Sequence, residues 1–182
     1  MKRTSAPAVP RRGALALALL APACAGAGMS GGGAKSGQGH DLLGAVAPPF
    51  SLSDVESGQR LGPDSFQGKV VIVDFWATWC APCRESFPVY QRLVDAHQGQ
   101  LVVLGVSVDE EPSGIAKFKS ETRVSFPLLW DEGQVVSNNY RPGTMPTSFI
   151  LDRNGVVKFI HEGFRSGDDV AIEREVSSLL SS

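Results

Sequence analysis

The sequence predicts an α/β fold in which helices pack on a central mixed sheet. Short β-branched runs typical of buried strands alternate along the chain with segments whose apolar residues recur at helical spacing. The last two strand-like runs flank residues 152–155, Asp-Arg-Asn-Gly, whose Asn-Gly step suits a tight hairpin. Alternating strands and helices that end in a hairpin imply an α/β sandwich around a mixed sheet.

The expected elements can be placed in chain order from residue 47. A short hairpin is expected at 47–61, where Ala-Pro-Pro-Phe-Ser-Leu and Arg-Leu flank a polar turn. The strands expected after it are 70–75, 101–108, 126–130, 147–151 and 156–161. The expected helices run from a cysteine pair to about His97, over 115–122 and over 168–180. The apolar side of the last helix is formed by Val170, Ile172, Val176, Leu179 and Leu180.

Pro88 lies inside the first expected helix. Proline lacks an N–H and its ring opposes the preceding turn, so a kink is expected there.

The first 24 residues have the features of an export signal. Basic residues come first, an apolar stretch follows at 14–21, and small residues lead to Cys24. The apolar stretch is short for a membrane span. A cysteine directly after such a segment resembles the lipidated cysteine of bacterial lipoproteins, although Ala21 stands where that pattern has Leu. An ordinary cleaved signal is the alternative.

Residues 25–44 are expected to form a flexible linker ahead of a domain at 45–182. The stretch is rich in Gly, Ser and Ala, and roughly 20 such residues span about 25 Å. That length would hold the domain off a membrane surface. A disordered leader without this role is the alternative.

Composition and charge fit one ordinary globular domain. The chain has 182 residues, of which 42% are hydrophobic and 20% charged. The formal charge of −2 includes four basic residues of the leader; without them, 13 Lys and Arg stand against 19 Asp and Glu, a charge of −6. No basic cluster is available to meet phosphates, so nucleic acid is not an expected partner.

The stretch 70–85 places two cysteines where a buried strand meets a helix. The apolar run 70–75 is typical of a central strand, and Pro82 suits a first helical turn. Cys80 then lies at or just before the helix N-terminus, where unpaired N–H groups and the helix dipole favour a thiolate. Cys83 follows about one turn later, close enough for a disulfide. A Cys-X-X-Cys pair in this setting is a redox signature.

A structural disulfide or half of a zinc site is the alternative to redox chemistry. Zinc would normally need two further ligands at matching spacing. The remaining cysteine and histidines, which form no second ligand pair, are Cys24, His40, His97 and His161. We therefore expect no metal and no organic cofactor, and the disulfide itself carries the electrons.

Two motifs resemble a known family. Residues 73–83, Val-Asp-Phe-Trp-Ala-Thr-Trp-Cys-Ala-Pro-Cys, are similar to the active site of thioredoxin-fold proteins. Residues 84–88, Arg-Glu-Ser-Phe-Pro, and 143–152, Gly-Thr-Met-Pro-Thr-Ser-Phe-Ile-Leu-Asp, resemble the TlpA/ResA-like thiol-disulfide oxidoreductases of bacterial envelopes. The resemblance covers about residues 45–180. It implies a thioredoxin fold preceded by an N-terminal hairpin and enlarged by a strand-helix insert.

The cysteine pair is expected to perform thiol-disulfide exchange. Cys80 is the expected nucleophile, because it should be the more exposed and more acidic thiol, and Cys83 is the expected resolving thiol. Ala81 and Pro82 supply neither a cation nor a strong donor to a thiolate. A reductant or exchanger is therefore favoured over a strong oxidant.

Asp74 stands where thioredoxins carry a buried acid, whereas TlpA-like proteins often have Asn there. If it is buried without a cation, desolvation raises its pKa, and it could relay a proton to or from Cys83. A carboxylate satisfied by water at a strand end is the alternative.

Met145 and Pro146 resemble the cis-proline loop that faces the cysteines in thioredoxin folds. Such a loop offers a backbone edge on which an extended peptide can pair. An ordinary trans proline in a surface turn is the alternative. Trp79 is expected to be exposed at the rim of this binding groove, together with Pro82, whereas Trp76 is expected in the core.

These interpretations predict an exported enzyme of the periplasm or cell envelope that reduces or exchanges disulfides in exported proteins such as apocytochrome c. In the resembled family the electron donor is commonly a membrane thiol transporter. A thiol peroxidase is one alternative, but peroxiredoxins have Thr or Ser three residues before the reactive cysteine, and Ala77 stands there. A copper or haem-delivery module is another, but its relatives usually have three residues between the cysteines and a distant His.

Overall fold

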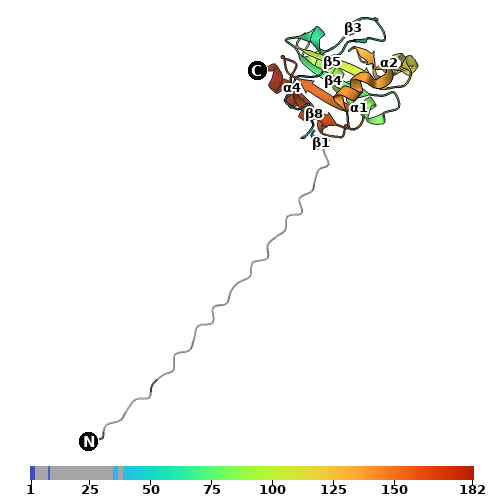
Figure 1. Ribbon diagram of the computed structural model, residues 1–182. Coiled ribbons are helices and arrows are strands. Elements are labelled where there is room, and N and C mark those ends of the chain that lie inside the picture. Colours follow the sequence, from blue (N-terminus) through green and yellow to red (C-terminus); the bar gives the residue numbers. More distant parts are fainter. Residues whose placement is uncertain (3–7, 9–34, 37–38) are drawn as a thin grey trace. The chain divides into compact units, whose positions relative to one another are not determined.

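The computed structural model describes residues 1–2, 8, 35–36 and 39–182, and all but the first three of these belong to one unit, Gly32–Ser182 (Figure 1). Cys24, most of the predicted signal segment and most of the predicted linker lie outside the described residues. Their assignment stays a prediction.

A mixed sheet forms the centre of the unit, with β4 (Val70–Trp76) inside it. β4 runs parallel to β5 (Leu101–Ser107) and antiparallel to β7 (Thr147–Leu151). The strand order is β1-β8-β7-β4-β5-β6, in which β6 (Leu128–Trp130) is parallel to β5, while β8 (Val157–Glu162) and β1 (Lys35–Ser36) are antiparallel to their neighbours. Every residue of β4 is buried, which explains its nearly continuous apolar sequence. The predicted fold class is confirmed.

Helices cover both faces of this sheet (Figure 1). α1 (Ala81–Ala96), α2 (Ile115–Thr122) and α4 (Asp168–Leu180) pack on one face, to which Trp76 contributes ring contacts with Phe87 of α1 and Phe118 of α2. α3 (Val135–Tyr140) packs on the other, where the Tyr140 ring lies 5.1 Å from the ring of Phe75. Successive residues of a strand point to opposite faces, so Asp74 shares the α1 face with Trp76.

The predicted N-terminal hairpin is formed by β2 (Leu52–Ser53) and β3 (Arg60–Leu61), and its turn covers the edge strand β6. Asp54 accepts hydrogen bonds from the N–H of Leu128 at 3.1 Å and from the hydroxyl of Ser57 at 2.6 Å. Burial raises the pKa of Asp54, but its hydrogen bonds and the charge of Lys119 outweigh burial and leave that pKa lowered. The hairpin thus satisfies backbone groups that an open edge would leave unpaired.

Short 3-10 helices connect several of these elements: η1 (Pro63–Phe66), η2 (Pro112–Gly114) and η3 (Glu132–Gln134). None of the helices in the described part of the chain is long and apolar enough to cross a membrane.

α1 continues through Pro88, which is exposed, so the carbonyl that loses its helical donor there can bond to water. The kink expected at Pro88 stays a prediction. In α4, one residue differs from the sequence-based expectation. Val170 was expected on the apolar side of α4, but 65% of it is exposed. It stands in the first turn of α4, off the buried side, which is formed by Asp168, Ile172, Val176 and Leu179.

The chain already contacts the domain ahead of the expected boundary at residue 45. The N–H of Gly44 donates to the carbonyl of Val157 at 2.8 Å, and the rings of His40 and Phe149 form a T-shaped pair with centroids 5.3 Å apart. Asp41 pairs with Arg141 at 2.7 Å. These contacts belong to the last residues of the expected linker, where Leu42 also packs against the core.

Candidate active site

The cysteine pair lies where β4 ends and α1 begins, and it forms a disulfide. Cys80 is the N-cap residue of α1, and its sulfur accepts a hydrogen bond from the N–H of Cys83 at 3.2 Å. Once the disulfide is reduced, the same N–H and the helix dipole favour a thiolate at Cys80. Cys80 is 4% exposed and Cys83 has no exposed surface, so Cys80 is the more exposed residue of the pair by a small margin.

The loop before Cys80 is fixed by a residue that the sequence analysis missed. Asp109, just beyond the end of β5, accepts hydrogen bonds from the N–H of Thr78 at 3.0 Å and from its hydroxyl at 2.9 Å. Ser107 donates to the same carboxylate at 2.7 Å. This clamp precedes Trp79, which is 72% exposed beside Cys80. An acid directly after an apolar strand was the available signal, but only the structure shows what it binds.

The predicted proline loop lies at the same end of the sheet as the cysteine loop. The Met145–Pro146 bond is cis, Pro146 is buried, and its carbonyl accepts a hydrogen bond from the N–H of Gly163 at 2.7 Å. Thr147, the next residue, pairs with Phe75 near the end of β4. Since β7 starts where β4 ends, the structure brings Met145 and Pro146 to the same end of the sheet as Trp79, Cys80 and Pro82.

Asp74 is fully buried on the α1 face, and its hydrogen bonds go to hydroxyls. Its Oδ1 accepts from Ser148 Oγ at 2.7 Å and from the Tyr90 hydroxyl at 3.3 Å. Among the described residues no hydrogen bond joins Asp74 to either cysteine, and its Oδ2 has no hydrogen-bond partner. Burial raises the pKa of Asp74 to about 7, an effect that the bonds from Ser148 and Tyr90 moderate. Strand β5 offers only Gly105 opposite it, and therefore no cation.

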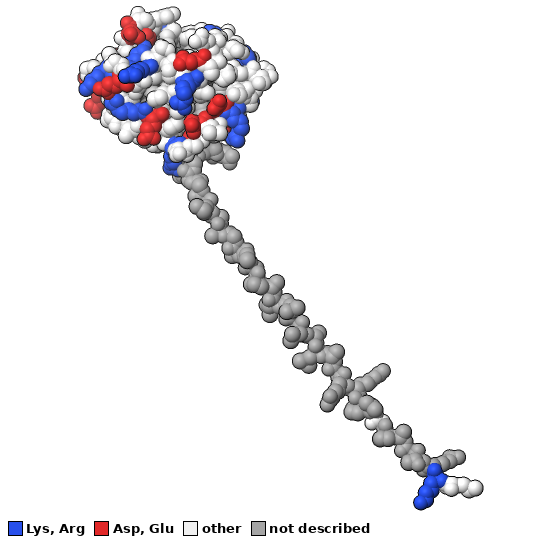
Figure 2. Space-filling model, turned by 180° about the vertical axis from the view of Figure 1, so that it is seen from behind, with Lys and Arg blue, Asp and Glu red and all other residues white. Residues whose placement is uncertain are grey.

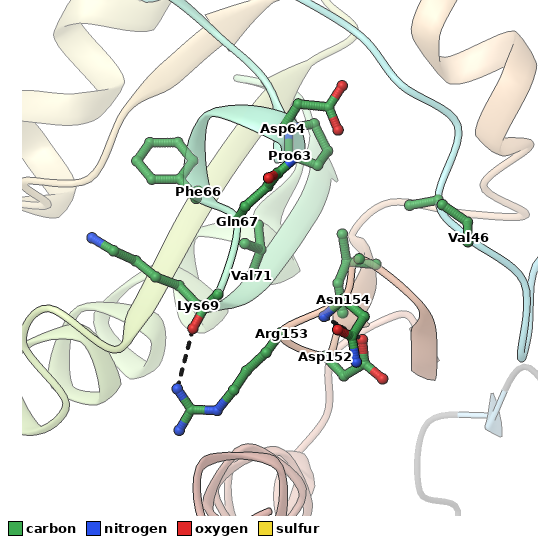
Figure 3. Close-up of a pocket in the computed structure, with 14 residues that line it drawn as sticks. Val46, Pro63, Asp64, Phe66, Gln67, Lys69, Val71, Asp152, Arg153 and Asn154 are labelled. Carbon is green, nitrogen blue, oxygen red and sulfur yellow. Dashed lines mark hydrogen bonds between the residues drawn. The ribbon is translucent and has the colours of Figure 1, made fainter.

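A cavity of about 440 Å³ lies at the opposite end of the sheet, where β4 begins and β7 ends (Figure 3). Within it, Arg153 donates to the carbonyl of Gly68 at 3.2 Å and also reaches that of Leu180. Its guanidinium therefore ties the ends of three elements together, and the cavity is separate from the redox site. In the described part of the chain, no three His, Cys, Asp or Glu side chains gather as metal ligands.

The fold and the disulfide at the N-terminus of α1 define a thioredoxin-fold protein of the thiol-disulfide oxidoreductase class. The model of the AhpC/TSA family matches residues 43–160. The thiol-disulfide oxidoreductase ResA of Geobacillus thermodenitrificans is 37% identical over 129 residues, or 70% of this chain and 74% of that protein. The thioredoxin-like protein YneN of Bacillus subtilis is 34% identical over 123 residues, or 66% and 71% of the two chains.

The comparison with solved structures supports the same class of protein. A Chlorobium tepidum protein assigned as the thiol:disulfide interchange protein DsbE matches with a TM-score of 0.72 at 34% identity, covering 76% of this chain and 97% of that one. The chain therefore belongs to the ResA-like thiol-disulfide oxidoreductases within the AhpC/TSA family.

Proposed function

We propose that this enzyme reduces or exchanges disulfides in exported proteins through Cys80 and Cys83, and that apocytochrome c is one of its substrates. The exposure of the two cysteine residues carries this assignment: Cys80 is 4% exposed beside the exposed Trp79, whereas Cys83 has no exposed surface. A partner disulfide can therefore meet Cys80 first. Pro82 and the Met145–Pro146 loop stand at the same end of the sheet, where an extended partner segment can bind.

In the reducing direction, the Cys80 thiolate attacks one sulfur of the partner disulfide. The other partner sulfur leaves and takes a proton from water, and a mixed disulfide remains. Cys83, deprotonated, then attacks the Cys80 sulfur, so the Cys80–Cys83 bond forms and the second partner sulfur leaves and is protonated. Two electrons pass to the partner. A dithiol donor, which we propose to be a membrane thiol-disulfide transporter, must return two electrons to the pair; neither a metal nor an organic cofactor takes part.

Asp74 is proposed to accept the proton that Cys83 loses as the mixed disulfide resolves. A carboxyl whose pKa burial raises to about 7 is half protonated near neutral pH, where it can both take and give a proton. The other six residues of β4 are apolar and buried, and they hold Asp74 in the sheet below α1. Its role lies in the second half of the exchange.

The loop before Cys80 argues against the alternative that this protein is a thiol peroxidase. Ala77, three residues before Cys80, has no hydroxyl, and the hydroxyl of Thr78 is bound to Asp109. The copper or haem-delivery alternative is disfavoured by the two-residue gap between the cysteines. Nucleic acid is not proposed as a partner, because the sequence after the leader has no basic cluster, and on the face shown in Figure 2 Lys and Arg are interspersed with Asp and Glu.

We place the enzyme outside the cytoplasm, in the periplasm or cell envelope, on the evidence of residues 1–24. Cys24 is proposed as a lipid anchor and the residues after it as the tether. An ordinary cleaved signal would leave the redox chemistry unchanged.

The test uses the chain without its predicted signal segment. It should reduce insulin disulfides when supplied with a dithiol, and Cys80→Ser should abolish this; a Cys80→Ser protein that kept its activity would refute the assignment. Oxidised apocytochrome c should be reduced with a higher kcat/KM than insulin. Equal kcat/KM values for the two substrates would show no preference for apocytochrome c and would leave only a general disulfide-exchange activity.

The role of Asp74 has its own test. Asp74→Asn should let the mixed disulfide form through Cys80 but slow release of the reduced partner, so that a trapped complex accumulates in acid-quenched samples. An unchanged release rate between about pH 6 and 8, around the pKa of about 7, would reduce Asp74 to a structural residue.

A further inference from the structure

A row of hydroxyls follows the buried side of α1 from the resolving cysteine. Cys83, Ser86 and Tyr90 stand at positions i, i+3 and i+7, so they share one face of the helix, and all three are buried. The Ser86 hydroxyl lies 3.2 Å from the carbonyl oxygen of Cys83 and also hydrogen-bonds with the Tyr90 oxygen, so its single proton goes to one of these two acceptors at a time. We call Ser86, Tyr90 and the facing Ser148 of β7 the hydroxyl row.

The hydroxyl row ends on one oxygen of Asp74. The hydroxyls of Tyr90 and Ser148 lie 2.5 Å apart, and both reach Asp74 Oδ1, at 3.3 Å and 2.7 Å. Each hydroxyl has a single proton. Ser148 therefore gives its proton to Asp74, and Tyr90 shares its proton between Ser148 and Asp74. Oδ2, which no described residue bonds, is left as the place for the exchangeable proton.

Among the residues that the structure describes, no fixed charge beside Asp74 takes the place of these hydroxyls. From α1 the titratable group facing it is Tyr90, β7 contributes Ser148, and β5 contributes Gly105. On the next strand, His161 of β8 pairs with Ser148 in register, but its Nε2 lies 2.6 Å from a Glu175 oxygen of α4. His161 and Glu175 thus pair with each other and not with Asp74. The balance at Asp74 is thus between burial, which raises its pKa, and the hydroxyls, which lower it.

We propose that Ser148 and Tyr90, supported by Ser86, are positioning residues that hold Asp74 by Oδ1 and set the pH at which it releases the proton on Oδ2. The inference rests on the proposed relay through Asp74. The donated hydrogen bonds stabilise the carboxylate more than the acid, so removing a hydroxyl makes Asp74 hold its proton to a higher pH. The proton comes from the Cys83 thiol and passes to water or to the departing partner sulfur, so the release step should follow the same shift.

The experiment titrates the Asp74 carboxyl carbon by 13C NMR in the oxidised protein and measures single-turnover partner release against pH. Ser148→Ala should move the Asp74 midpoint up by about one pH unit, the size expected for a hydrogen bond to a charged group. Tyr90→Phe, which keeps the ring in place, should move it in the same direction by less, because its bond to Oδ1 is longer. In both variants the pH profile of release should move with the midpoint.

Tyr140→Phe is the matched control. Tyr140 is also a fully buried tyrosine, but its hydroxyl donates to the carbonyl of Pro48 at 2.8 Å, and its ring packs against Phe75 on the other face of the sheet. Its loss should leave the Asp74 midpoint where it is. An unmoved midpoint in both Ser148→Ala and Tyr90→Phe would overturn the inference, as would an equal movement in Tyr140→Phe.

The inference and the relay fail in different ways. If the relay is wrong, Asp74→Asn leaves the release rate unchanged, whatever the titrations show. If the positioning is wrong, Asp74→Asn slows partner release, but the titration midpoint of Asp74 stays the same in Ser148→Ala and Tyr90→Phe.

Discussion

Replacing Asp74 with Asn should make the folded protein less sensitive to pH, and the structure gives the size of this effect. The pKa of Asp74 rises from 3.8 to about 7 in the folded state because the side chain is buried. A raised folded-state pKa means that the folded protein binds the proton more tightly than the unfolded chain. Below pH 3.8 the Asp74 side chain is protonated in both states, so its ionisation does not lower the free energy of unfolding. As the pH rises from 3.8 to about 7, that free energy falls.

The loss over this window is about 4 kcal/mol, because a shift of one pKa unit corresponds to about 1.4 kcal/mol. Asp74→Asn removes the ionisation and with it this loss. The new amide places an N–H group at or near the unpartnered Oδ2 position, which costs about 1–3 kcal/mol at every pH. The variant should accordingly be less stable than the parent near pH 4 and about equal or more stable near pH 8.

Urea denaturation of the two oxidised proteins between about pH 4 and 8, spanning the two pKa values of Asp74, measures this difference directly. All other titrating groups are common to both chains, so their contributions cancel. Two curves of unfolding free energy that stay parallel over this range would refute the argument, because they would show that Asp74 titrates alike in the folded and unfolded states.

Three further outcomes are expected. In the reduced protein, Cys80 should titrate below the value of about 8.5 of a free thiol and Cys83 above it, as followed by thiolate absorbance; equal, unshifted values would remove the argument from the helix N-terminus. Asp54→Ala should lower the free energy of unfolding by about 2 kcal/mol at pH 7, because the N–H of Leu128 loses its acceptor. Since hydrogen bonds lower the pKa of Asp54, that deficit should shrink as the pH falls through its lowered pKa, and thermal or urea unfolding at two pH values checks both points. A fatty-acid probe should label the protein at Cys24 and Cys24→Ser should release it from membranes, whereas an unlabelled soluble protein would indicate an ordinary signal peptide.

The sequence was most informative where structure is local. The run 70–75 predicted β4, and the segments 115–122 and 168–180 predicted α2 and α4 with their observed bounds. Cys80 could be placed at the start of α1 because the strand, the proline and the cysteine spacing all lie within a few residues. α3 was not predicted, since six residues are too few to show helical spacing.

In the active site, too, the local features could be predicted from the sequence and the long-range contacts could not. That Cys80 and Cys83 pair, and that Cys80 caps a helix, follows from residues three apart in the chain, where the helical geometry leaves little freedom. The resemblance of the Met145–Pro146 segment to a cis-proline loop could also be seen in the sequence. Its position at the cysteine end of the sheet depends on β7 running antiparallel to β4, which the sheet register decides.

What only the tertiary structure decided is the set of partners around the buried acids. Asp74 meets a serine 74 residues away, and the hydroxyls of Tyr90 and Ser148 meet across 58 residues. Asp109 clamps a loop 31 residues before it. A carboxylate in an apolar run signals by itself only that burial must be compensated or its pKa must rise. Which hydroxyls compensate it depends on how the strands and α1 pack against one another, and neither periodicity nor motif spacing contains that information.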